Sequence, residues 1–165
     1  MREGLLITLI AMLALVLQTT VLPHLAIGRA TPDLLLIICV YVGLRHHSVG
    51  GALGAFFLGY LQDAFSGQVV GLNAFGMCLV YVVVYLTSRR LWVDNALSTV
   101  VLVLLASVTK TLSVLLLVAL FLSVEGWVKT TLQYLPLQAV LAALCSIPMF
   151  ALLTLTQVVG HEEDE

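Results

Sequence analysis

The sequence predicts an all-α, polytopic integral membrane bundle of six transmembrane helices. Hydrophobic residues make up 61% of the 165-residue chain, whereas charged residues make up only 10%. A soluble domain of this length would need many more charged side chains to cover its surface. The apolar runs are separated by short polar segments, which leave no room for a separate soluble domain. We therefore expect one transmembrane domain over residues 1–160 and a short acidic cytoplasmic tail at 161–165.

The first three apolar runs predict one full helix and a short helical hairpin. The run at 4–22 ends at Pro23, and no small-x-small cleavage site follows, so we expect a retained helix rather than a signal peptide. The runs at 34–44 and 52–61 are each shorter than the ~20 residues that span a bilayer. A basic, glycine-containing turn at 45–51 separates them. This arrangement predicts short second and third helices, which pack against each other in opposite directions.

The remaining apolar runs predict three longer helices. We expect the fourth at about 72–87, the fifth within 96–124 and the sixth at about 135–159. The fifth run is long for one span, which indicates a tilted or projecting helix. Pro136 fits the first turn of the sixth helix, whereas Pro148 predicts a kink within it.

The distribution of basic residues predicts cytoplasmic termini. Six helices place both ends of the chain on one side of the membrane. If that side is the cytoplasm, four basic residues lie inside and two lie outside, which follows the positive-inside rule. The inner residues are Arg2, Arg45, Arg89 and Arg90, and the outer ones are Arg29 and Lys129. We expect the segments near Arg29, Ser66 and Lys129 to face the exterior.

The sequence offers little for catalysis, metal binding or nucleic acid. Its three cysteines sit singly in apolar runs and form no Cys/His metal motif. It contains no GxSxG, HExxH or phosphate-binding loop. The adjacent pair His46-His47 points in two directions about 100° apart on a helix, which suits chelation poorly. No basic patch is large enough for nucleic acid. We expect no enzymatic activity, no metal and no cofactor.

The second arm of the hairpin carries a face of small residues. Gly51, Ala55 and Gly59 recur at every fourth position, and Gly54 lies beside them. In membranes such a face allows another helix to approach closely. We expect the hairpin to pack there against a neighbouring helix or a partner's helix.

Polar residues within the apolar runs predict a polar layer in the outer half of the bundle. Asp33 and Asp63 each lie fifteen residues from Ser48, so an antiparallel hairpin brings them to similar depth. Gln18 and Lys110 reach a comparable depth in their own helices, at ~1.5 Å of rise per residue. The complete layer comprises Gln18, Asp63, Asn73, Lys110 and Gln138, with Asp33 at the same end.

Three roles for this layer remain open. Asp63 and Lys110 form a natural salt bridge by depth and sign, because a charge in hydrocarbon usually has a partner. Such a pair would lock the fifth helix to the hairpin. The layer could instead hold a ligand or a partner's helix, or it could conduct protons or ions.

The region 31–75 combines several spaced polar residues and glycines. They are Pro32-Asp33, Arg45, the spaced glycines, Gln62-Asp63-Ala64-Phe65-Ser66-Gly67 and Gly71-Leu72-Asn73. This combination resembles the bacterial rod shape-determining MreD family. The resemblance implies a non-enzymatic component of the cell-wall elongation machinery in the cytoplasmic (inner) membrane. It also makes Asp33, Arg45 and the small-residue face candidates for structural or partner contacts.

The resemblance also implies a set of partners. The direct partner is an MreC-like bitopic periplasmic protein. More indirect partners are an MreB-like filament and the wall polymerase and transpeptidase pair, with membrane lipid around the bundle. The main alternative is a small-molecule or lipid binding or transport subunit with an outward polar pocket. That alternative rests on a likeness in architecture to the small substrate-binding subunits of energy-coupling-factor transporters.

Overall fold

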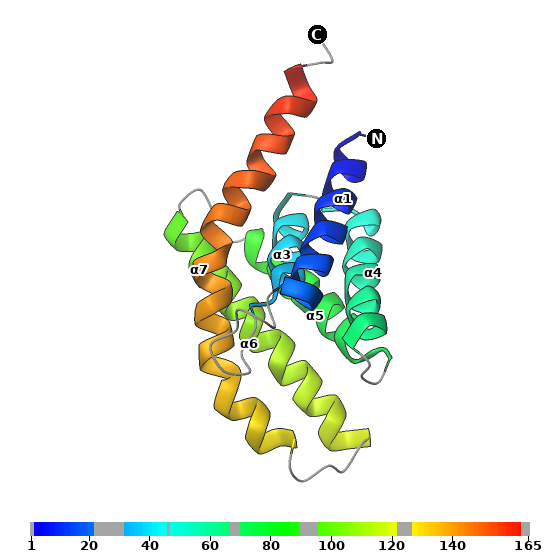
Figure 1. The fold of residues 1–165 in the computed structure, drawn as a ribbon, viewed down its shortest axis with the longest axis vertical. Coiled ribbons are helices and arrows are strands. Elements are labelled where there is room, and N and C mark those ends of the chain that lie inside the picture. Colours follow the sequence, from blue (N-terminus) through cyan, green and yellow to red (C-terminus); the bar gives the residue numbers. More distant parts are fainter. Residues whose placement is uncertain are drawn as a thin grey trace.

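The chain forms a bundle of α-helices in the computed structural model, which describes residues 2–21, 32–45, 47–66, 70–89, 96–121 and 127–162 (Figure 1). These residues contain no strand, so the all-α prediction is confirmed for them. The elements are α1 (Arg2–Val16), the π-helix η1 (Leu17–Val21), α3 (Leu34–Arg45), α4 (Val49–Ser66), α5 (Leu72–Ser88), α6 (Ala96–Phe121) and α7 (Trp127–Glu162).

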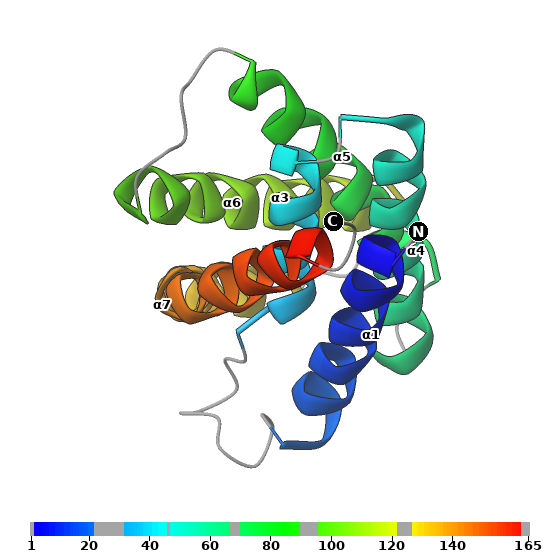
Figure 2. The ribbon, with the colours of Figure 1, turned by 90° about the horizontal axis from the view of Figure 1, so that it is seen from above.

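Helix α3 lies at the centre of the bundle. It contacts each of the other α-helices, and every residue from Leu34 to Gly43 is buried. A helix that is apolar on all sides has no face that prefers water, so burial suits it. Tyr41 anchors α3 to α7, because its hydroxyl donates a 3.1 Å hydrogen bond to the Leu153 carbonyl and its ring meets Phe150 edge-on. Figures 1 and 2 show α7 on one side of α3 and α1 and α4 on the other, while α6 crosses the bundle obliquely.

Helices α6 and α7 present apolar surface to the outside. Residues Leu97–Leu120 and Pro136–Thr154 are each long and apolar enough to cross a membrane, and only 28% of the apolar stretch in each is buried. The exposed side chains of α6 recur at every turn. They are Leu97, Val101, Leu105, Val108, Leu112, Leu116 and Leu120. An apolar surface of this extent is unfavourable in water and suits contact with lipid.

Glycines set the closest contacts between helices. A Cβ added at Gly59 of α4 would lie 2.5 Å from the Cα of Ala74 and 2.6 Å from the carbonyl oxygen of Asn73 in α5. Real Cβ atoms do not approach backbone so closely, so only glycine allows this crossing. A Cβ added at Gly54 would meet nothing within 4 Å. The predicted small-residue face is therefore divided, because Gly59 is covered by α5 of the same chain and Gly54 opens outward.

Several predicted helix boundaries differ from the structure. Helix α3 has 12 residues and is short, as expected, but α4 has 18, so the expectation of a short third helix is wrong. Helix α7 begins at Trp127, so Lys129 lies in a helix rather than in a loop, and Pro136 lies in the helix interior rather than in the first turn.

Helix α7 continues through Pro136 and Pro148, and Figure 1 shows it bowed along its length. A proline ring inside a helix removes one hydrogen bond and crowds the preceding turn, which bends the axis. The helix also takes in His161 and Glu162 of the predicted tail. The predictions for Arg29, His46 and Arg90 lie outside the residues that the structure describes.

Candidate functional site

Asp33 caps the N-terminus of α3. It precedes the first helical residue, and its Oδ1 atom accepts a 3.1 Å hydrogen bond from the backbone N–H of Leu36. This is the N-cap arrangement, in which a side-chain oxygen satisfies one of the free N–H groups of the first turn. The Asp33 side chain keeps 23% of its surface exposed.

Lys110 of α6 and Gln62 of α4 meet this carboxylate. The Lys110 ammonium donates to Asp33 Oδ2 and to Gln62 Oε1, the latter at 2.6 Å. Gln62 Nε2 in turn donates to Asp33 Oδ2 at 3.3 Å. The Lys110 side chain is only 10% exposed, so its charge depends on these two acceptors. The three side chains thereby join helices α3, α4 and α6.

Asp63 joins α4 to the N-terminus of α5 instead. Its Oδ2 accepts hydrogen bonds from the backbone N–H groups of Gly71 at 2.8 Å and Ala74 at 3.2 Å. Its Oδ1 accepts from the backbone and side-chain N–H groups of Asn73 at 3.0 and 2.9 Å. A carboxylate suits this position, because a helix N-terminus carries free N–H groups and the positive end of the dipole.

The expected salt bridge between Asp63 and Lys110 is therefore wrong, because Lys110 pairs with Asp33. The physical reason is the direction in which side chains leave helix α4. Neighbouring residues on a helix point about 100° apart, so Gln62 faces α3 and α6 while Asp63 faces α5. Lys110 nevertheless meets Asp33 and Gln62, so these three residues lie at one level along the bundle.

Two groups of contacts, linked by the neighbouring residues Gln62 and Asp63 of α4, together form what we name the polar junction: Asp33, Gln62 and Lys110 in one group, and Asp63 and Asn73 in the other. Two glycines permit its geometry. Gly59 lets α5 approach α4, and Gly71 adopts a φ of 105°, in the left-handed region that favours glycine. In the sequence, Gln62 stood out only as part of the segment 62–67 that resembles the MreD family, and no role was predicted for it. Its signal was its position beside Asp63 at the polar end of an apolar helix.

The other residues of the predicted polar layer lie apart from the junction. Within the described part of the chain, neither Gln18 nor Gln138 is hydrogen-bonded to a junction residue, and Gln18 Oε1 is buried without a hydrogen-bond partner. Arg45 lies at the other end of α3 and is exposed. The predicted polar layer is therefore smaller than expected and centred on helices α3 to α6.

An aromatic cluster ties the opposite end of the hairpin to α5. The Tyr81 hydroxyl donates a 3.0 Å hydrogen bond to the Ser48 carbonyl in the turn before α4. His47 Nε2 lies 3.0 Å from Ser88 Oγ, and the Ser88 hydroxyl donates to the Tyr85 carbonyl at 2.8 Å. Because the Ser88 proton is used there, His47 Nε2 is the donor in the first contact.

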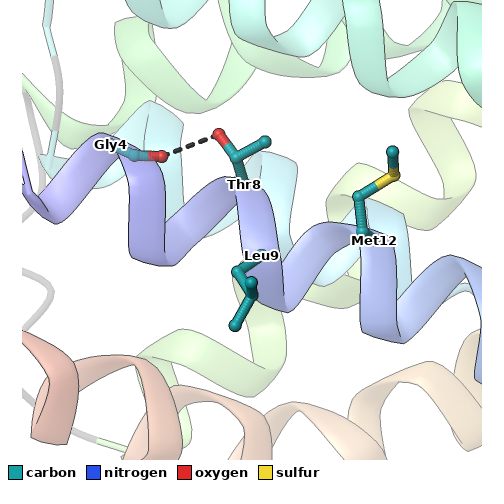
Figure 3. Close-up of a pocket in the computed structure, with 4 residues that line it drawn as sticks. All are labelled: Gly4, Thr8, Leu9 and Met12. Carbon is teal, nitrogen blue, oxygen red and sulfur yellow. Dashed lines mark hydrogen bonds between the residues drawn. The ribbon is translucent and has the colours of Figure 1, made fainter.

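A pocket on α1 does not provide the outward polar cavity of the alternative hypothesis. Its volume is about 400 Å³, and it is lined by Gly4, Thr8, Leu9 and Met12 (Figure 3). The Thr8 hydroxyl already donates to the Gly4 carbonyl at 2.7 Å. The lining includes no residue of the polar junction and no titratable group.

The described residues contain no group of three or more His, Cys, Asp or Glu side chains that could hold a metal ion. The Cys39 thiol lies buried in α3 and donates to the Met77 carbonyl over 3.5 Å. Cys39, Cys78 and Cys145 are all free. The arrangement of the polar junction favours a structural role, because its polar groups are directed at each other and at helix ends.

A helical bundle with apolar residues on its outer helices and paired charges inside has the architecture of an integral membrane protein. Residues 2–156 match the family model described as rod shape-determining protein MreD, and the chain belongs to that family. It is thus a bacterial inner membrane protein with a role in determining rod shape. No curated protein and no solved structure gives a significant match, so the likeness to energy-coupling-factor subunits is unsupported.

Proposed function

We propose that this chain is a non-enzymatic scaffold of the cell-wall elongation machinery. In this proposal, residues 1–160 form one domain whose six helices each cross the inner membrane, with both termini in the cytoplasm. The polar junction is the observation that carries the proposal. Its hydrogen bonds and its ion pair join helices α3, α4, α5 and α6 at one end of the bundle.

A scaffold needs a fixed shape, and the junction supplies one. Asp63 accepts hydrogen bonds from Gly71, the N-cap of α5, and from Asn73 and Ala74 within that helix. Lys110 is held by two acceptors, Asp33 at the start of α3 and Gln62 in α4. Each of these groups is used within the chain. A solute-binding subunit would instead direct several polar groups into an enclosed pocket. The internal pairing therefore favours the scaffold over the transport alternative.

The scaffold's direct partner is an MreC-like bitopic protein, whose single transmembrane helix binds the outer face of α4. MreB-like filaments and the wall polymerase and transpeptidase pair are linked to it more indirectly. The supporting observation is the notch at Gly54, where no atom lies within 4 Å of an added Cβ. Leu53 and Phe57 flank this notch and are 55% and 60% exposed. A small residue between large ones suits close approach of a second helix.

The proposal is tested by co-purifying the partner from membranes with variants of α4. Gly54→Leu should fold normally, because its side chain enters open space, but it should fill the notch and reduce recovery of the MreC-like partner at least about tenfold. Ala119→Leu is the matched control, since Ala119 is an exposed small residue on α6, outside the proposed docking face of α4. Normal partner recovery with folded Gly54→Leu, together with normal rod shape, would contradict this docking face.

A further inference from the structure

Arg89, at the C-terminal end of α5, has a guanidinium held in place by aromatic rings. Its Cζ atom lies 5.2 Å from the centroid of the Tyr85 ring, a distance typical of a cation–π contact. Tyr85 stacks on Tyr81 with an interplanar angle of 7°, and His47 meets it edge-on with centroids 5.3 Å apart. These contacts give the guanidinium a defined position at the end of the helix.

The Arg89 side chain faces outward, and no carboxylate of the described residues pairs with it. Among the residues that the structure describes, the one salt bridge joins Lys110 to Asp33, and the Arg89 side chain is exposed. A guanidinium presents five N–H donors in a planar fork that matches two oxygens of a phosphate group. Arg45 adds a second exposed positive charge at the same end of the hairpin. The site is therefore suited to an anion.

An apolar stripe leads away from Arg89 along the outer face of α5. Phe75, Val82 and Leu86 are 43%, 47% and 58% exposed. Their spacing of seven and four residues, with Arg89 three further on, places all four side chains on one face of the helix. The distance from Phe75 to Arg89 along the axis is ~21 Å, which exceeds the ~15 Å depth of one leaflet's hydrocarbon.

We propose that this face of α5 binds an anionic phospholipid, with the headgroup phosphate at Arg89 and one acyl chain along Phe75, Val82 and Leu86. A lipid of this class is charged at one end and apolar along its length, as the face requires. An apolar partner helix would cover the stripe and leave the guanidinium unpaired. The inference rests on the proposed topology, which puts Arg89 at the level of the cytoplasmic headgroups, where anionic lipids attract basic side chains.

The test is native mass spectrometry of the purified full-length chain in detergent, with dioleoylphosphatidylglycerol or dioleoylphosphatidylcholine added at equal concentration. The wild-type chain should retain phosphatidylglycerol preferentially. Arg89→Gln should weaken phosphatidylglycerol retention about fivefold, the effect of one basic side chain near an anionic headgroup, and leave phosphatidylcholine unchanged. Leu86→Asn should weaken both lipids alike, because it interrupts the acyl-chain contact without changing charge.

Arg29→Gln is the matched control, because it removes the same charge from a different part of the sequence. An equal loss of phosphatidylglycerol retention in both arginine variants would show that net charge, rather than a site at Arg89, causes the effect, and it would overturn the proposal. If thermal unfolding in detergent shows that Arg89→Gln does not fold, Leu86→Asn carries the test, and unchanged retention of both lipids in it overturns the proposal.

Two further outcomes separate a lipid site from a protein interface. If Leu86→Asn loses the MreC-like partner while lipid retention stays normal, the stripe is an interface with protein and the lipid site is wrong. Lipid retention is measured on the purified chain without partners. Failure of the lipid site therefore leaves the scaffold role intact, whereas a wild-type chain that retains phosphatidylglycerol but recovers no MreC-like partner from membranes contradicts the scaffold role and leaves the lipid site intact.

Discussion

Lys110 and Asp33 lie 77 residues apart in the sequence, and their charged groups are in contact. The contact joins the middle of α6 to the N-cap of α3, and Gln62 of α4 bridges both partners. The carboxylate thus has two roles, since one oxygen caps α3 and the other receives the ammonium. Helix α6 can therefore carry a charge midway along an otherwise apolar sequence.

The Lys110–Asp33 pair should appear as coupling in a double-mutant cycle. Lys110→Met alone should destabilise the bundle by about 3 kcal/mol, because it leaves a mostly buried carboxylate without its counter-ion. Asp33→Asn keeps an oxygen for the N-cap and removes the charge. The double variant should be more stable than the sum of the single effects predicts, by about 1–3 kcal/mol. Unfolding in mixed detergent micelles measures each free energy.

The control for this cycle pairs Lys110→Met with Asp63→Asn. Because Asp63 is hydrogen-bonded to α5 and Lys110 to Asp33, these two effects should add within about 0.5 kcal/mol. Strong coupling between Lys110 and Asp63, without coupling to Asp33, would contradict the arrangement of the junction.

Asp63 should matter more for stability than its neighbour Asn73. Asp63→Ala removes the acceptor for three backbone N–H groups and one side-chain N–H, in a residue that is 1% exposed. Buried donors that lose a charged acceptor cost about 1.5–3 kcal/mol each, and water recovers part of this. We expect a loss of at least about 3 kcal/mol, against about 1 kcal/mol for Asn73→Ala. Equal losses in the two variants would count against the capping role.

Gly54 and Gly59 of α4 should respond oppositely to alanine. Gly59→Ala places a methyl group against the backbone of Ala74 and Asn73 and should destabilise the bundle by about 1–3 kcal/mol or more. Gly54→Ala meets nothing within 4 Å and should be neutral or stabilising by up to about 1 kcal/mol, because alanine favours the helix. Thermal unfolding in one detergent compares them directly, and similar losses would disprove the difference in packing.

Cysteine labelling tests the proposed orientation. In a background without the three native cysteines, Ser66→Cys should react with an impermeant maleimide in intact spheroplasts. Arg89→Cys should react only after the membrane is permeabilised, because the positive-inside rule puts this end in the cytoplasm. Labelling of position 89 from the exterior would reverse the topology.

The helical segments, and the end of the hairpin at which Asp33 and Gln62 meet, were predictable from the sequence. Apolar runs identified the helical segments, and the run at 34–44 coincides closely with α3. Counting residues from Ser48 placed Asp33 at the same end as Gln62-Asp63, and the contact between Asp33 and Gln62 confirms it. Rise per residue fixes depth, so these estimates needed no knowledge of the packing.

Direction around a helix was not predictable in the same way. Lys110 had two carboxylates at similar depth, and depth alone cannot choose between them. The choice depends on how α4 is rotated, and one residue changes that direction by about 100°. The lengths of α4 and α7 were missed for a related reason. The segments 62–66 and 129–131 contain polar residues typical of loops, but both are helical, and at 62–66 the contact of Asp63 with α5 favours this extension.

The short length of α3 has a consequence for the insertion of the chain into the membrane. Its 12 residues extend ~18 Å, far less than the hydrocarbon core, so a newly made α3 in lipid alone would hold Asp33 or Arg45 within the apolar layer. Asp33 gains its counter-ion only when Lys110 has been synthesised, 77 residues later. A nascent chain that stops before α6 should therefore remain associated with the insertion machinery or be degraded, whereas a chain that extends beyond α6 can leave it.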